Sequence, residues 1–276
     1  MLKQRLLTAA ILIPLVVWAI FASSLTSFTG LIVAVALIAG WEWYEVLGIK
    51  SPALRVILMI DLLAVFYLAL TQVNPHFTIS IGILLWTLAA LVILGFASKT
   101  GAAYLTSLFR NKIFGIIISV LVLTIFVVSS VTIKAMGAPG AFLFLFALVT
   151  VWLADTGGYF AGKQFGKHSL ASSISPNKTW EGVAGGVAFA SIWAVGFYLI
   201  AEPSNMSLVS WFFISLLTVL AAIVGDLFES LFKRAYDVKD SGHLLPGHGG
   251  MLDRVDSLLA AIPVFAFIVL LMSSLA

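Results

Sequence analysis

The sequence predicts an all-α integral membrane protein that crosses the bilayer about nine times. Of the 276 residues, 62% are hydrophobic and only 10% are charged, whereas soluble domains average about 45–50% apolar and about 25% charged residues. The mean hydropathy is +1.14. Most of the chain consists of uncharged runs as long as the roughly 20 residues that one membrane helix needs. These observations exclude a water-soluble fold, and the absence of cysteine excludes disulfides and thiolate metal sites.

The spans follow from the charge-free runs and their polar breaks. The run Leu6–Trp41 is twice the length of one span, and Ser23–Ser27 divides it. The run Leu62–Ser98 is divided in the same way by the turn residues Asn74–His76. The nine helices are expected at about residues 6–22, 28–47, 55–73, 77–97, 113–133, 139–162, 181–201, 207–233 and 253–275.

The first segment has an alternative interpretation as a cleaved signal peptide. Lys3 and Arg5 precede an apolar run, which is typical of such peptides. The run continues past Ala22 into a second span, however, and no A-x-A cleavage site stands out. We therefore expect this segment to remain as a membrane span.

The basic residues indicate the orientation of the chain. With nine spans and a cytoplasmic N-terminus, all of the 15 Lys and Arg residues except Lys134 lie on the cytoplasmic side, as the positive-inside rule requires. The C-terminus then lies outside. We divide the chain into residues 1–112, with helices 1–4 and a cytoplasmic loop, and residues 113–276, a catalytic region with helices 5–9 and cytoplasmic loops at 163–180 and 234–252.

The acidic residues indicate where the chemistry lies. A carboxylate at mid-bilayer costs about 2.5–3.5 kcal/mol on insertion scales, yet most acidic residues fall within helices. All of them except Glu202 are placed near cytoplasmic helix ends or in the last cytoplasmic loop. This convergence predicts a water-accessible polar site at the cytoplasmic face. For Glu42, Glu45 and Asp61, the simpler interpretation is a helix cap or a surface charge.

The first polar loop follows Asp155 and its three nearby glycines. Those glycines permit either close helix packing or close approach of a ligand. Ser175 and Pro176 predict a helix start, with Ser as N-cap and Pro at the first helical position. A helix N-terminus beside Lys178 suits a phosphate, but a capped helix with a packing patch explains the loop equally well.

The second polar loop separates two pairs of carboxylates. Asp226, Glu229 and Lys233 have i, i+3, i+7 spacing and therefore share one helical face. Asp253 and Asp256 share a face at the start of the last helix. The pairs thus lie on the ends of two antiparallel neighbours, where oxygen ligands suit Mg²⁺. The alternative is a loop with salt bridges, but the placement of acids inside helix ends favours a functional site.

A glycine run and four cations accompany these carboxylates. The run Pro246–Gly250 can direct successive backbone N–H groups at an anion. Within it, His248 suits loop stabilisation, phosphate binding or nucleotide contact, and these roles stay open. The cations are Lys233, Arg234, Lys239 and Arg254. Carboxylates for a metal, cations for phosphates and glycines for close approach are the parts that phosphoryl transfer uses.

The stretch Ser230–Asp256 places Ser, Lys-Arg, Lys-Asp, Pro-x-His-Gly-Gly and Asp-Arg-x-Asp at fixed spacings. In this arrangement it resembles the signature of the phosphatidate cytidylyltransferases, also called CDP-diacylglycerol synthases, and every specified position of that signature is met. The stretches 155–158 and 175–182 also resemble that family. The similarity that distinguishes this family from other membrane proteins runs from about Asp155 to Ser257. The N-terminal half is compatible with the family but contains no residues specific to it.

The resemblance implies a reaction in which phosphatidate and CTP give CDP-diacylglycerol and pyrophosphate. It implies Mg²⁺ dependence, with K⁺ as a candidate second cation, and, in bacterial members, a homodimer. The charge distribution predicts a site that faces the cytoplasm, and for a bacterial source we expect the inner membrane. The metal-binding aspartates of the family carry over to Asp226 and Asp253, and we expect Glu229 and Asp256 beside them. The expected phosphate contacts, counted as catalytic, are Lys233, Arg234, Lys239 and Arg254. The expected substrate-binding residues are Ser175, Lys178, Thr179, Glu181, His248, Gly249 and Gly250.

Two other functions are alternatives to this one. A cation-coupled transporter also places carboxylates inside helices, but its site normally lies at the midplane between repeated halves. Here the charges gather on one side, and the outer halves of the helices are nearly free of charge. A CDP-alcohol phosphatidyltransferase would need an Asp-x-x-Asp-Gly motif, which the sequence lacks.

Overall fold

The computed structural model describes residues 13–97, 107–201, 206–242 and 249–275. Within them, eight helices are long and apolar enough to cross a membrane. These helices are α2 (Leu25–Val46), α3 (Pro52–Thr71), α4 (Pro75–Ala97), α6 (Lys112–Lys134), α7 (Ala138–Phe165), α8 (Trp180–Ala201), α9 (Leu208–Ala235) and α10 (Leu252–Leu275). Each corresponds to a predicted span to within a few residues. Of the first predicted helix, residues 13–21 are helical and residues 6–12 lie outside the described residues.

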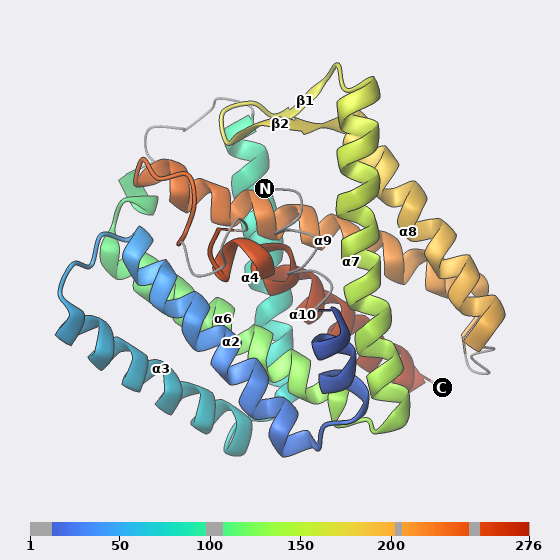
Figure 1. Ribbon diagram of the computed structural model, residues 1–276, viewed down its shortest axis with the longest axis horizontal. Helices are drawn as coiled ribbons and strands as arrows, with labels where there is room; N and C mark the ends of the chain where they lie inside the picture. The colour runs from blue at the N-terminus through green and yellow to red at the C-terminus, as the bar shows by residue number, and fades with distance from the viewer. Residues whose placement is uncertain (1–12, 98–106, 202–205, 243–248, 276) are drawn as a thin grey trace.

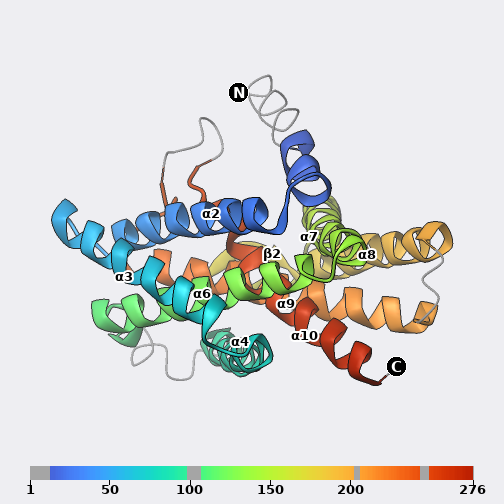
Figure 2. The same cartoon turned by 90° about the horizontal axis from the view of Figure 1, so that it is seen from below.

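The helices form two groups around a shared centre. Figure 1 shows α7 and α8 side by side at one end of the long axis, and α2, α3 and α6 at the other. Figure 2 places α6 between α2 and α4; α10 packs against α6, and α9 packs against α10. α6 and α10 are the most deeply buried spans. The polar ends of α9 and α10 therefore lie where both groups of helices meet.

Polar residues at the predicted breaks cap the helices. The Ser24 hydroxyl accepts a hydrogen bond from the Ser27 N–H of α2 at 3.1 Å. The Asn74 side chain accepts from the His76 N–H of α4 at 2.9 Å. Such caps satisfy backbone donors that the first turn of a helix leaves free, which explains why the breaks fall at these residues.

Glycines allow α7 and α8 to touch backbone to backbone. A Cβ at Gly157 would lie 2.5 Å from the Gly185 carbonyl oxygen, and one at Gly186 would lie 2.9 Å from the Ala154 carbonyl oxygen. Interfaces of small residues are typical of packed membrane helices. Of the two roles considered for the glycines after Asp155, close packing is the one that Gly157 performs.

A β-hairpin replaces the helix start expected at Ser175. Strand β1 (Ser169–Ala171) pairs antiparallel with β2 (Ser175–Thr179), and α8 begins only at Trp180. The prediction of an N-cap at Ser175 is therefore wrong, and an all-α description omits this hairpin. Pro176 is tolerated because each strand of a two-stranded sheet has a free edge that needs no N–H donor. The cap is Thr179, whose hydroxyl accepts from the Gly182 N–H at 3.1 Å.

Candidate functional site

Lysines and carboxylates form a cluster where β2, α9 and α10 meet. Lys178 on β2 forms an ion pair with Asp226 on α9. Lys233 on α9 forms ion pairs with Glu229, one turn earlier, and with Asp253 on α10, the latter at 2.8 Å between Nζ and Oδ1. The Glu229 side chain is only 3% exposed, whereas that of Asp226 is 22% exposed. The structure thus brings together residues predicted from both polar loops.

A glycine sets the spacing of the carboxylates on α9 and α10. A Cβ at Gly225 would lie within 3.0 Å of the Asp256 carbonyl oxygen, so the two helices approach at the residue before Asp226. Asp256 consequently interacts electrostatically with both Asp226 and Glu229. The four predicted carboxylates form one network in which Glu229 also interacts with Asp226 and Asp253.

Asp253 is held by backbone as well as by Lys233. Its carboxylate accepts hydrogen bonds from the Ser241 N–H at 3.0 Å and from the Gly250 N–H at 2.9 Å. Gly249 has φ +79°, a conformation that favours glycine, and a Cβ there would meet the Asp253 carboxylate. The glycine run therefore does direct an N–H at an anion, and in this structure that anion is Asp253.

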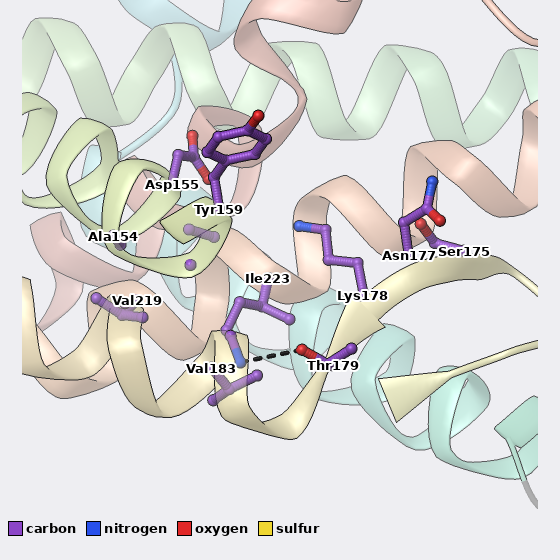
Figure 3. Close-up of a pocket in the computed structure, with 14 residues that line it drawn as sticks. Ala154, Asp155, Tyr159, Ser175, Asn177, Lys178, Thr179, Val183, Val219 and Ile223 are labelled. Atoms are coloured by element: carbon purple, nitrogen blue, oxygen red, sulfur yellow. Dashed lines mark hydrogen bonds between the residues drawn. The ribbon is translucent and has the colours of Figure 1, made fainter. Parts of the chain in front are cut away.

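A cavity of about 260 Å³ opens beside the cluster, between α7, β2, α8 and α9. In Figure 3, Asp155 projects from α7, and Lys178 projects from β2 toward the cavity. The opposite wall contains the apolar side chains of Val183, Val219 and Ile223. Asp155 interacts electrostatically with Lys178, Asp226 and Arg254, which links the cavity to the cluster. The cavity therefore has one polar end and one apolar wall.

Lys178 is positively charged at neutral pH. Burial lowers the pKa of its ammonium, whereas the adjacent Asp226 carboxylate raises the pKa, and Asp155 and Asp256 act in the same direction as Asp226. The net effect raises the pKa above its ordinary value. Because a raised pKa favours the protonated form, Lys178 presents a cation to the cavity.

The other predicted contacts fall in different places. Ser175 and Thr179 line the cavity with Lys178. The Arg234 Nε donates to the Ile174 carbonyl at 3.2 Å, which joins α9 to the hairpin. Glu181 pairs with His168, at 2.6 Å between Oε1 and Nδ1.

Two further predicted cations lie at the surface of the described part of the chain. Lys239 and Arg254 are exposed. His248 lies outside the described residues.

Sequence reasoning missed Glu42 on α2. Of its two interpretations, the surface charge is wrong, because the residue is only 5% exposed. Its Oε2 accepts from the Leu252 N–H at 2.8 Å, as a helix cap does, and from the Ser241 hydroxyl at 3.3 Å. Glu45 and Asp61, grouped with it, are exposed as expected. The available signal was a carboxylate directly after a long apolar run, which by itself does not identify a distant partner.

The donors in the cluster fit Mg²⁺ chemically. Among the described residues, no group of three or more His, Asp or Glu side chains could hold a metal ion by protein ligands alone. Mg²⁺, however, usually takes one or two carboxylates and leaves the remaining positions to water and substrate phosphates. Oε1 of Glu229 is buried without a hydrogen-bond partner in the described part of the chain. An oxygen-only set of this kind suits a hard cation that brings further ligands.

Comparison with known proteins identifies the family of this chain. A model of the Cytidylyltransferase family matches residues 3–272. The chain is similar to a phosphatidate cytidylyltransferase of Haemophilus influenzae, with 35% identity over 97% of this chain and 98% of that protein. It is also similar to one of Pseudomonas aeruginosa, with 39% identity over 96% of both. One of Bacillus subtilis is 42% identical over 52% of this chain and 53% of its own length. A match across nearly all of the chain places this protein in the cytidylyltransferase family.

Proposed function

We propose that this protein is a phosphatidate cytidylyltransferase, which transfers CMP from CTP to phosphatidate and releases pyrophosphate. The product is CDP-diacylglycerol, a precursor for phospholipid biosynthesis. Family membership and the names of the full-length relatives support this reaction. The structural observation that carries it is the lysine–carboxylate cluster beside a cavity with one polar end and one apolar wall.

The cavity suits the lipid substrate. Ser175 and Lys178 at its polar end would bind the phosphate of phosphatidate, while Val183 and Ile223 would contact its apolar part. A cationic ammonium bonded to a phosphate contributes more than a neutral hydrogen bond does. We infer that acyl chains leave the cavity sideways between helices, since the lipid stays in its leaflet.

The remaining cations suit the nucleotide. Arg234, Lys239 and Arg254 lie on or beside the ends of α9 and α10, where CTP would arrive from the cytosol. The backbone at Gly249 and Gly250, with His248, would approach its phosphates closely. These groups would stabilise the charge that develops on the α-phosphate and on the leaving pyrophosphate.

The reaction needs charge neutralisation more than a general base. The nucleophile is a phosphate oxygen, which is already ionised near neutral pH. Lys178 and Lys233 now neutralise carboxylates, and we infer that they turn to substrate phosphates when these bind. Asp226 and Asp253 would hold Mg²⁺, with Glu229 and Asp256 beside them and K⁺ as a candidate second cation. Bound Mg²⁺ supplies Lewis acidity and further positive charge for the phosphates.

We further propose that the site faces the cytoplasm of a bacterial inner-membrane protein with nine spans, a cytoplasmic N-terminus and an outer C-terminus. The strong bias of basic residues supports this orientation. We also propose a homodimer, as the resemblance to the bacterial family implies.

The test uses purified full-length protein in detergent with phosphatidate, radiolabelled CTP and Mg²⁺. We expect a lipid-soluble, CMP-labelled product that forms only when both substrates are present. Diacylglycerol replaces phosphatidate in the control, because it has the same acyl chains but lacks the nucleophilic phosphate. Folded, monodisperse protein that forms no labelled lipid would contradict the proposed function.

A further inference from the structure

Glu42 is an acidic side chain inside the protein that the reaction described above does not use. It lies near the end of α2, is 5% exposed and has no ion-pair partner among the described residues. A buried carboxylate without a partner is costly. Its position therefore depends on the hydrogen bonds that it accepts.

Those hydrogen bonds come from both ends of the segment that carries the glycine run. The Glu42 Oε2 accepts from the Ser241 hydroxyl at 3.3 Å, before the run, and from the Leu252 N–H at 2.8 Å, at the first residue of α10. The Leu252 N–H is one of the first-turn donors that a helix cannot satisfy internally. Glu42 thus caps α10 from a helix 210 residues earlier in the chain.

The same two attachment points hold Asp253. The Ser241 backbone N–H donates to the Asp253 carboxylate at 3.0 Å, and Leu252 is its immediate neighbour. The fit around Glu42 is tight, because a Cβ at either Gly242 or Gly250 would lie within 3.0 Å of the Glu42 carboxylate oxygens. A change at Glu42 would therefore move Ser241 and the start of α10 relative to each other.

We propose that Glu42 is a positioning residue for cytidylyl transfer: its carboxylate ties Ser241 to the N-terminus of α10 and thereby fixes the orientation of Asp253. Glu42 touches neither substrate, and it acts through Asp253. The effect of Glu42 on catalysis rests on the proposed function. The hydrogen bonds that tie Ser241 to Leu252 through Glu42 belong to the fold, and their contribution can be measured without substrates.

The experiment compares Glu42→Leu and Glu42→Gln with the wild type. Leucine removes the acceptor while keeping a similar volume, whereas glutamine keeps one acceptor oxygen. Loss of a supporting group commonly costs about 10–100-fold in activity. We expect Glu42→Leu to lower kcat by at least about tenfold, with a smaller change in the KM for CTP, and Glu42→Gln to lie between Glu42→Leu and the wild type.

The matched control is Glu45→Gln, on the same helix. The Glu45 side chain is 57% exposed and pairs with Arg55 at the surface, so we expect kcat to stay at the wild-type value. Wild-type kcat in Glu42→Leu would overturn the proposal.

The second readout is amide hydrogen exchange without substrates. In Glu42→Leu we expect faster exchange in peptides that contain Ser241 and Leu252, and unchanged exchange in α6 and α7. Uniformly faster exchange in every helix would indicate a merely structural role and overturn the proposal. If the wild type forms no CDP-lipid, the proposed function is wrong. If exchange at Ser241 and Leu252 is unchanged in Glu42→Leu, the proposed structural role of Glu42 is wrong.

Should Glu42→Leu not fold, a double-mutant cycle of Glu42→Gln and Ser241→Ala decides the matter. Two residues that act through one shared contact give non-additive effects. We expect the double variant to lose little more kcat than the more impaired single variant. Additive losses would show that the two side chains act independently, and would overturn the proposal.

Discussion

At the scale of single residues, Asp253 is the most connected carboxylate of the cluster. It accepts from Lys233 and from two backbone N–H groups, so its orientation is fixed before any substrate binds. Preorganised groups of this kind are what electrostatic catalysis requires. Its charge, more than its shape, is what the proposed site uses.

Asp253→Asn should therefore abolish most of the activity while the fold is kept. The substitution preserves size but removes the charge that faces Lys233, and we expect at least a roughly 100-fold loss in CDP-lipid formation. The measurement is activity over a Mg²⁺ titration. Asp237→Asn serves as control, since Asp237 is exposed and has φ 56°, a conformation that asparagine also adopts. Full activity of Asp253→Asn at every Mg²⁺ concentration would refute the metal assignment.

The sequence revealed the residues of the cluster but not their support. Asp226, Glu229 and Lys233 share a helical face, and this can be recognised from spacing alone. Glu42 could not be found in this way, because its partners are a hydroxyl and a backbone N–H far along the chain. Backbone donors leave no pattern in the sequence.

At the scale of elements, the contact between α9 and α10 depends on one glycine. Any side chain at Gly225 would meet the backbone of α10 at Asp256 and Ser257. Overpacking of this kind typically costs about 1–3 kcal/mol, and here it would also separate Asp226 from Asp256.

Gly225→Ala should lower both thermal stability and activity. The measurements are the melting temperature in detergent and the rate of CDP-lipid formation. Gly196→Ala on α8 is the control, because a Cβ there meets nothing within 4 Å, and we expect it to leave both quantities unchanged. The packing argument would fail if the two variants behaved alike.

The helices could be predicted well and the hairpin could not. Membrane helices are encoded by long apolar runs, and α6 at Lys112–Lys134 agrees closely with the expected 113–133. The strands Ser169–Ala171 and Ser175–Thr179 have only three and five residues, so they are too short to show the alternation by which strands are recognised. Pro176 then favoured the wrong element, because proline suits a first helical turn as well as an edge strand.

At the scale of the whole molecule, the proposed orientation separates Lys134 from the site. Lys134 ends α6 and lies beside a cavity of about 400 Å³ with Phe21 and Phe142. Lys112, at the other end of α6, donates to the Gly48 carbonyl at 3.0 Å. The two ends of this span should therefore face opposite sides of the membrane.

Cysteine labelling can test this orientation directly, because the chain contains no cysteine. In spheroplasts, whose inner membrane is intact, a membrane-impermeant thiol reagent should label Lys134→Cys. Lys167→Cys, in the exposed segment before the hairpin, should react only after permeabilisation. The reverse pattern would show that the site faces outward.

The tie between Glu42 and Leu252 also has a consequence for biosynthesis. A ribosome that adds about 5–20 residues per second needs roughly 10–40 seconds to proceed from one residue to the other, which are 210 positions apart. During that interval the Glu42 carboxylate has already been inserted without its final partner. It should stay hydrated at the membrane surface until the last helix arrives. Assembly of the proposed site then has to wait for α10, and a nascent chain that stops before Leu252 would remain inactive.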